Sequence, residues 1–271
     1  MTFLIHNLSL GYQGIPVVQR VCLTLNRGEL IGILGPNGAG KSSLLKAMAG
    51  DLKPELGHIL LDEQAVFTQT SIQLAKKRAY LPQNPEYAFN MTVRQLLELG
   101  LYAFKNIGYE SALGFYQQVL SQTATDESLL DRPLVQLSGG QLQRVHMARV
   151  LVQLQAMLHE QTCGWLLIDE PLSSLDPLHQ QHLLALCQRL VRETNVGVVI
   201  VLHDLNLAAQ WCDRLILLAD QHVLVDAAPI EALTSQNLFQ AFGVRFDVFE
   251  RQVDCVKRLV ALPNALINKV I

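Results

Sequence analysis

The chain has 271 residues, which is enough to bury a full hydrophobic core, and we expect one large domain with at most a small appendage. A formal net charge of −3 at pH 7 argues against nucleic acid as the main partner. Hydrophobic residues make up 50% of the chain, but their runs, such as Val198–Leu202, are far shorter than the roughly 18 residues that cross a bilayer. The start shows no basic segment before a long apolar stretch, so we expect no signal peptide and a cytosolic protein with apolar surface for partners.

In chain order, strand-like runs occur at 3–5 and 21–25, and a turn at 26–28 leads into a third run at 30–34. A helix-like segment at 43–48 stops at a turn over 50–54. The remaining strand-like runs are 58–61, 78–81, 164–168, 196–202, 214–218 and 223–225, and residues 244–249 alternate in a way that predicts a further small strand.

Between about residues 92 and 136 the apolar spacing is helical, which predicts a helical subdomain inserted into the fold. The run at 164–168 is nearly all apolar, as in strands buried on both faces of a parallel sheet. Because strand and helix patterns alternate along the chain, we predict an α/β sandwich.

The histidines and cysteines give no clear metal site. Five cysteines are scattered without metal-ligand spacing, and we expect reduced, mostly buried thiols at Cys22, Cys163, Cys187, Cys212 and Cys255. His179 and His182 could share a metal from one helix face, but no third ligand is evident nearby. Solvated histidines are the better interpretation.

Residues 35–42 fit the phosphate-binding spacing G-x-x-x-x-G-K-[ST] and stand between a strand-like and a helix-like segment. Glycines let the backbone turn sharply and direct N–H groups at phosphate oxygens, and the following helix start adds partial positive charge. Lys41 would reach the β- and γ-phosphates, and the Ser42 hydroxyl would ligate Mg²⁺. A glycine-rich turn that matches by chance is the alternative, but the register of strand, loop and helix favours a nucleoside triphosphate site. The residues of this loop are Gly35, Pro36, Asn37, Gly38, Ala39, Gly40, Lys41 and Ser42.

A carboxylate for the magnesium ion is expected at the end of a buried strand. Asp169 ends the apolar run at 164–168 and would hold Mg²⁺, usually through water. Glu170 follows and could polarise an attacking water as general base. Glu170 could instead only cap the following turn, but its pairing with a phosphate loop favours catalysis.

A second stretch, Leu137–Gln141, precedes a strongly helical run at 142–158. Ser138 is a good N-cap residue, and Gly139 and Gly140 leave backbone N–H groups bare, so this helix start can also bind an anion. One chain that binds one nucleotide has no evident need for two phosphate cradles. Two chains packed head to tail do, because each would close the other's site.

The phosphate loop, Leu137–Gln141 and Asp169–Glu170, in this order and spacing, resemble the nucleotide-binding subunit of an ATP-binding cassette (ABC) transporter over roughly residues 2–243. The resemblance implies a P-loop NTPase of the ABC type, an α/β fold with a mostly parallel core sheet, an N-terminal antiparallel β region and the inserted α-helical subdomain. Residues 1–271 would form a single ABC ATPase domain with its core at 1–91 and 137–243, the helical subdomain at about 92–136 and a short C-terminal extension at 244–271. The ligands implied are ATP and Mg²⁺.

The resemblance also implies a role for several further residues. Leu137, Ser138, Gly139, Gly140 and Gln141 would complete the ATP site of the opposite subunit, with the last four contacting the γ-phosphate. Tyr12 would stack on adenine, Gln83 would sense Mg²⁺ and the attacking water, and His203 would contact the γ-phosphate and position the water. The loop that contains Ser174 and Asp176 would link the two sites across the dimer. Ser43 stands where the family more often has Thr, and its hydroxyl keeps a contact with the α-phosphate possible.

Taken alone, these smaller matches are weak. Tyr12 fits a packed loop aromatic equally well, Gln83 carries no signal of its own, and a lone His203 would more often be a half-buried histidine with satisfied hydrogen bonds. Their order around the three strong motifs supports the functional interpretation.

Without a membrane span, the permease must be a separate polypeptide, which favours an importer over an exporter fused to its membrane domain. Several segments resemble subunits that energise haem uptake, namely 81–83 followed by 89–93, 144–151, the extension through Gln161 before 164–167, and 202–209. Importers of iron–siderophore complexes or vitamin B12 share much of this pattern. The expected partners are a second copy in a head-to-tail homodimer, a polytopic permease dimer and, indirectly, a periplasmic binding protein. The expected location is the cytoplasmic face of the bacterial inner membrane, as a peripheral protein.

The region at 84–135 would transmit motion to a short cytoplasmic helix of the permease, and the apolar stretch Tyr87–Phe89 suits that contact or, equally, a buried loop. A soluble cassette ATPase acting on ribosomes or DNA is a second hypothesis. Those proteins usually carry two cassettes or a long coiled coil, and this chain has one cassette and no heptad run. A binding module without hydrolysis is disfavoured by Glu170 and His203.

Overall fold

The computed structural model describes residues 2–85, 90–160, 163–253 and 256–264. Its centre is a six-stranded sheet in which all neighbours are parallel except the edge pair β10–β9. In spatial order the strands are β10 (His222–Ala227), β9 (Arg214–Ala219), β3 (Leu30–Leu34), β8 (Val196–Val201), β7 (Gly164–Ile168) and β6 (Arg78–Leu81). A second, antiparallel sheet has the order β2 (Ile15–Asn26), β1 (Thr2–Tyr12), β4 (Leu56–Leu61) and β5 (Gln64–Ala65). The predicted fold class is therefore confirmed.

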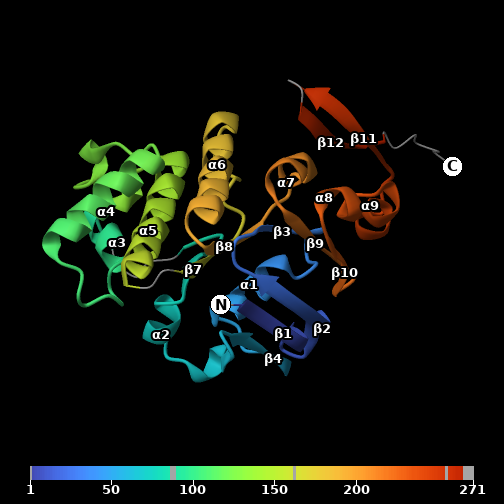
Figure 1. Cartoon of the computed structure of the whole chain (residues 1–271), viewed down its shortest axis with the longest axis horizontal. Coiled ribbons are helices and arrows are strands. Elements are labelled where there is room, and N and C mark those ends of the chain that lie inside the picture. Colours follow the sequence, from blue (N-terminus) through green and yellow to red (C-terminus); the bar gives the residue numbers. More distant parts are fainter. Residues whose placement is uncertain (1, 86–89, 161–162, 254–255, 265–271) are drawn as a thin grey trace.

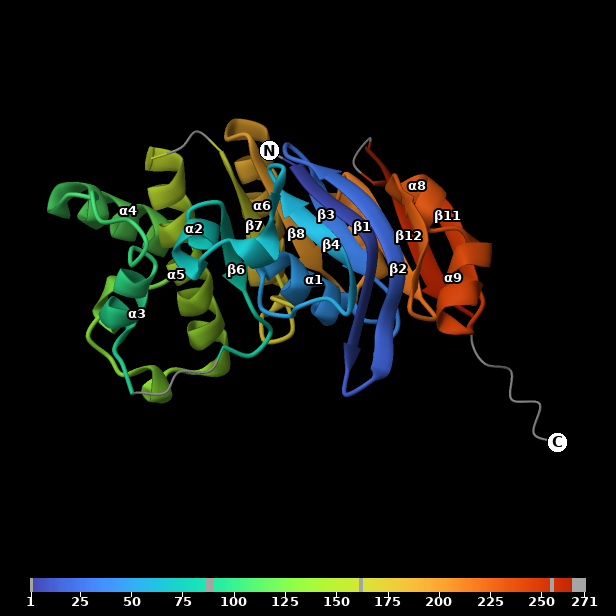
Figure 2. The same ribbon diagram turned by 90° about the horizontal axis from the view of Figure 1, so that it is seen from below.

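The core sheet is buried on both faces because its strands carry apolar side chains at successive positions. In β3, Ile31 and Ile33 face a cluster shared with the antiparallel sheet, whereas Leu30 and Leu34 face a cluster shared with the helices. The two sheets are joined through an edge-on aromatic contact between Phe3 and Trp165, with ring centroids 4.9 Å apart. Helix α1 (Lys41–Ala49) packs into the same cluster between the sheets, as Figure 2 shows.

The other face of the core sheet is covered by helices that follow the strands. These helices are α6 (Pro177–Glu193), α7 (Leu205–Trp211), α8 (Pro229–Ala232) and α9 (Ser235–Phe242). The short helix α2 (Ser71–Ala75) comes directly before β6 in the chain. Short 3₁₀ turns lie at Val66–Thr68, Glu127–Leu129 and Leu134–Gln136. Side-chain caps fix several starts; for example, Asp204 Oδ1 accepts hydrogen bonds from the N–H groups of Asn206 and Leu207 at the start of α7.

A separate group of helices forms one end of the molecule (Figure 1). Helices α3 (Val93–Leu99) and α4 (Tyr109–Gln122) both pack on the long α5 (Gly139–Glu160), which also contacts β6 and β7. Thr92 and Pro133 form an isolated antiparallel bridge, so the two ends of the inserted segment meet. Helix α5 therefore connects this group to the core sheet. Within the described residues, no helix combines the length and apolar character needed to cross a bilayer.

The tail forms a hairpin rather than one small strand. Strand β11 (Phe246–Val253) pairs antiparallel with β12 (Val256–Pro263) at the end of the molecule opposite the helical group (Figures 1 and 2). The Asn206 side chain on α7 holds β12, because its Oδ1 accepts from the Ala261 N–H at 2.8 Å and its Nδ2 donates to the Ala261 carbonyl at 3.4 Å. The sequence pattern predicted the first strand only.

The predicted thiols divide between core and surface. Cys187 and Cys212 are buried and Cys163 is partly buried, in line with the prediction of mostly buried thiols, whereas Cys22 is exposed on β2 and departs from it. Cys255 lies outside the described residues. Cys22 alternates with buried neighbours along its strand and therefore faces outward.

Candidate functional site

The glycine-rich loop between β3 and α1 follows a path that other residues could not take. Gly35 and Gly40 have φ angles of +147° and +93°, which L side chains rarely adopt. A Cβ at Gly35 would also collide with the Leu218 carbonyl oxygen, and one at Gly40 would collide with the Val18 side chain. The loop is thus fixed against β9 and β2, with its backbone wrapped around the start of α1.

Lys41 lies at the centre of this loop and is only 5% exposed. Its Nζ donates to the carbonyl oxygens of Gly35 at 2.9 Å and of Pro36 at 3.0 Å. Burial lowers the pKa of the Lys41 ammonium, and the nearby carboxylates Glu170 and Asp169 oppose that shift. An anion in the loop would supply the counter-charge that this buried cation needs.

The side chains beside the loop are joined by hydroxyl contacts. Tyr12 Oη lies 3.4 Å from Ser43 Oγ, so the half-exposed Tyr12 ring is held next to the first turn of α1. Ser42 Oγ donates to Asp169 Oδ1 at 2.9 Å, which joins the phosphate loop to the end of β7.

Asp169 has the properties of a cation ligand. It is fully buried, and its Oδ2 has no hydrogen-bond partner among the described residues. Burial raises the pKa of its carboxyl, the Ser42 hydrogen bond lowers it, and the neighbouring Glu170 raises it. A hydroxyl and a carboxylate oxygen are hard ligands of the kind that Mg²⁺ prefers, and an unpartnered buried oxygen is what such an ion would satisfy.

Glu170 is held between two residues that follow the neighbouring strands. Gln83 Nε2 donates to Glu170 Oε2 at 2.6 Å, and His203 Nε2 lies 2.8 Å from Glu170 Oε1. Gln83, Glu170 and His203 follow β6, β7 and β8, which are adjacent parallel strands, so their carboxyl ends meet at one edge of the sheet. Glu170 also has a φ of +48°, a strained conformation for a residue with a side chain. This carboxylate can accept a proton from a water placed between it and the phosphate loop.

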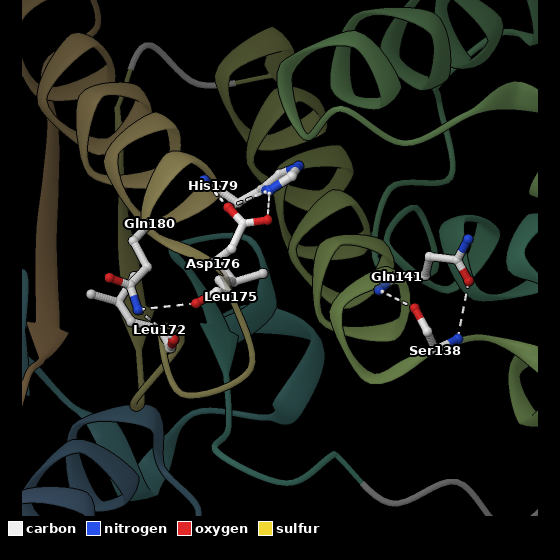
Figure 3. A network of polar contacts seen from close by, with 7 residues as sticks. All are labelled: Ser138, Gln141, Leu172, Leu175, Asp176, His179 and Gln180. Carbon is white, nitrogen blue, oxygen red and sulfur yellow. Dashed lines mark hydrogen bonds and ion pairs between the residues drawn. The ribbon is translucent and has the colours of Figure 1, made fainter.

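The Leu137–Gln141 stretch starts α5 with reciprocal hydrogen bonds (Figure 3). The Ser138 N–H donates to Gln141 Oε1 at 3.0 Å, and the Gln141 N–H donates to Ser138 Oγ at 3.3 Å, which is a capping box. Among the described residues, no hydrogen bond joins this stretch to the loop at 35–42. Its glycine N–H groups are therefore available to a different anion.

The loop that ends at Asp176 adjoins this helix start. Asp176 caps α6, because its Oδ1 accepts the His179 N–H at 3.0 Å, and Pro177 occupies the first helical position. His182 is exposed, so the prediction of a solvated histidine is confirmed there. The prediction is wrong for His179, because its ring Nδ1 lies 2.8 Å from Asp176 Oδ2. Among the described residues, no three or more His, Cys, Asp or Glu side chains are grouped so that they could hold a metal ion.

A groove that the sequence analysis did not find lies between the core and the helical group. Its floor carries Arg78 and Arg149, whose guanidinium groups donate to the carbonyl oxygens of Ala49 at 2.8 Å and Tyr80 at 2.9 Å. Its rim carries the exposed apolar side chains Ile72, Leu99 and Tyr102. These residues come from three separate segments of the chain, at 72–78, 99–102 and 149, so no local pattern could have grouped them. The stretch Tyr87–Phe89, which fits a permease contact or a buried loop equally well, lies outside the described residues.

The chain matches the ABC transporter family model over residues 18–173. It is 41% identical over 248 residues to the hemin import ATP-binding protein HmuV of Bordetella pertussis, which covers 92% of this chain and 94% of that protein. The protein of the same name from Escherichia coli O157:H7 is 38% identical over 246 residues, covering 90% and 93%.

Among solved structures, one described as a metal-chelate type ABC transporter in an inward-facing conformation aligns with a TM-score of 0.78 at 25% identity over 97% of both chains. A bacterial ABC transporter cassette solved as a dimer aligns with a TM-score of 0.73 at 25% identity, over 84% of this chain and 98% of that one.

Proposed function

The chain belongs to the ABC transporter family, and we propose that it is the ATP-hydrolysing subunit of a bacterial importer that takes up haem through a separate permease. The observation that carries the catalytic part is the placement of Glu170 between Gln83 and His203, beside the Ser42–Asp169 pair. The substrate rests on kinship, because the relatives named above are hemin import proteins and the transported molecule does not enter this site. Iron–siderophore and vitamin B12 import are the alternatives.

In the proposed reaction, the loop at 35–42 binds the ATP phosphates with its N–H groups, and Lys41 exchanges its carbonyl contacts for β- and γ-phosphate oxygens. Tyr12 stacks on adenine, and Ser43 reaches the α-phosphate. Ser42 and Asp169 would hold Mg²⁺, and the ion would supply positive charge to offset the charge that develops on the phosphates. Glu170 takes the proton of the attacking water, while Gln83 and His203 orient that water and the γ-phosphate.

The capping box at Ser138–Gln141 supports a head-to-tail homodimer. Its N–H groups form no hydrogen bond with the chain's own phosphate loop, and a helix start of this kind binds phosphate well. We infer that Leu137–Gln141 of each copy completes the ATP site of the other, and that Ser174 and Asp176 contact that site as well. ATP then joins the two copies, and hydrolysis releases them.

The groove between core and helical group is the surface that we assign to the permease. An amphipathic helix fits it, with apolar residues against Ile72, Leu99 and Tyr102 and an acidic residue or its carbonyl end toward Arg78 and Arg149. Pro82 and Pro85 also line the groove, so a helix seated there would contact the segment that carries Gln83, whose side chain bonds to Glu170.

The test is to purify the chain together with its permease, in liposomes, and to measure ATP hydrolysis with three forms of binding protein, loaded with haem, a ferric siderophore or cobalamin. Stimulation by the haem-loaded form alone is expected. Stimulation only by one of the other two would replace haem as the substrate. A chain that hydrolyses ATP but binds no permease would contradict the importer assignment and favour a soluble cassette ATPase.

The groove is tested in the same preparation with Tyr102→Asp, which places a charge on its apolar rim. The matched control is Tyr109→Asp, because Tyr109 is also exposed, at the start of α4, outside the groove. We expect only Tyr102→Asp to lose the permease. Equal retention of the permease by both variants would contradict this surface.

A further inference from the structure

The loop before α6 is fastened to its own subunit at several points. Gln180 Nε2 donates to the carbonyl oxygens of Leu172 and Leu175, both at 3.1 Å, so one side chain holds two backbone positions of the loop (Figure 3). The Leu175 N–H donates to the Leu172 carbonyl at 3.2 Å, which closes the turn that Gln180 clamps. Gln143 on α5 donates to the Pro171 carbonyl at 3.2 Å and fixes the start of the loop.

His179 fixes the end of the loop by a different contact. Its Nδ1 lies 2.9 Å from Oδ1 and 2.8 Å from Oδ2 of Asp176, in addition to the backbone cap. A cap needs only one carboxylate oxygen, so the ring contact holds the second oxygen and sets the rotamer of Asp176. The hydrogen bonds from His179 also lower the pKa of the Asp176 carboxyl, so this carboxylate stays ionised.

The opposite side of the loop is open. Ser173 and Ser174 are exposed, and the Asp176 side chain is 59% exposed although it is anchored. The Ser174 carbonyl also lies beside the anion-binding start of α5, 3.4 Å from where a Cβ on Gly140 would stand. The loop therefore presents Ser174 and Asp176 outward. The carbonyl groups of Pro171, Leu172 and Leu175 accept hydrogen bonds from side chains of the same subunit.

We propose that His179 and Gln180 are positioning residues that hold Ser174 and Asp176 in the one conformation that fits the nucleotide site of the partner subunit. The inference rests on the proposed function, in which this loop meets the partner's site. A loop that is already ordered does not lose conformational freedom when the dimer closes. Removing either clamp therefore weakens closure and catalysis, while each subunit's own grip on ATP, made by the loop at 35–42, stays intact.

The experiment compares His179→Leu, His179→Asn, Gln180→Met and two controls from the same helix, Gln181→Met and His182→Leu. Both control positions are exposed and neither side chain bonds to the loop, although the His182 ring lies against His179. ATP hydrolysis is measured against ATP concentration, and ATP-driven dimerisation is measured by light scattering with Glu170→Gln added.

For His179→Leu and Gln180→Met we expect kcat to fall roughly tenfold through misplacement of the loop. Their KM for ATP should stay within about twofold, because ground-state binding is untouched. His179→Asn should keep the wild-type kcat, since its amide can donate from the position of Nδ1. Both controls should behave as wild type.

Wild-type kcat in both His179→Leu and Gln180→Met would overturn the inference, as would a raised KM with unchanged kcat or a His179→Asn variant as impaired as His179→Leu. Thermal unfolding checks that the variants fold, and the two clamps test the loop independently if one variant fails to fold. If the wild-type protein neither hydrolyses ATP nor dimerises, the proposed function itself fails. If the wild-type protein is active and the His179→Leu and Gln180→Met variants are equally active, only the inference about the loop fails.

Discussion

Replacing Glu170 with Gln tests the chemistry of the site most directly. The change keeps the length and shape of a side chain that is only 14% exposed and contacts Gln83 and His203. The amide cannot accept a proton from water, so only the proposed general-base function is lost. The amide oxygen can still accept a hydrogen bond from Gln83, and the fold should be preserved.

The magnitude follows from the role. A positioned general base contributes about 10²- to 10⁴-fold to a rate, which corresponds to about 3–5 kcal/mol of activation free energy. ATP affinity should be equal or higher, because Glu170 places a negative charge near the phosphate loop, where it partly opposes the lowering of the Lys41 pKa by burial. The variant should therefore bind ATP, dimerise and turn over very slowly.

The assay is single-turnover hydrolysis of ATP, with binding measured separately by a fluorescent ATP analogue. Glu110→Gln is the matched control, because Glu110 is exposed at the start of α4. A Glu170→Gln variant that hydrolyses ATP at the wild-type rate would refute the general-base assignment. A variant that loses ATP binding would refute the view that Glu170 acts only on the chemical step.

Three further predictions concern stability and pH. Gly197→Ala should destabilise the protein by about 1–3 kcal/mol, because the added Cβ collides with the Trp165 ring, and an unchanged urea midpoint would contradict this packing. Asn206→Ala removes both hydrogen bonds to Ala261, so hydrogen exchange in β12 should speed up, and equal protection would show that the hairpin docks without this side chain. Burial, with a smaller effect of Arg149, lowers the pKa of His146 to about 4. The unfolded chain takes up this proton at higher pH than the folded chain, so the free energy of unfolding should fall as pH drops from about 6.5 toward 4. At pH 5 the loss should be about 2 kcal/mol relative to His146→Gln, which lacks the titrating group. Parallel pH profiles of stability for the two proteins would refute this prediction.

The helices and strands that carry the motifs were predicted well because their signals are local. The apolar runs at 30–34 and 164–168 are β3 and β7, and the helix after Ser138 extends over 139–160. The pattern did not predict β5, α2, α8, α9 or the second strand of the terminal hairpin. These elements are short or depend on a partner strand elsewhere in the chain, so neighbouring residues do not specify them.

For the candidate site, the sequence by itself determined the glycine-rich loop, the Asp169–Glu170 pair and the capped start of α5, because each depends on consecutive residues and on backbone conformations that only certain residues allow. Only the tertiary structure decided which side chains meet. Gln83, Glu170 and His203 come together because β6, β7 and β8 are adjacent and parallel. Arg78 and Arg149 share a groove because α5 packs against β6. The contact between His179 and Asp176 is different, because the two residues are three positions apart at one helix start, and this local pairing is one that a helical pattern permits but does not require.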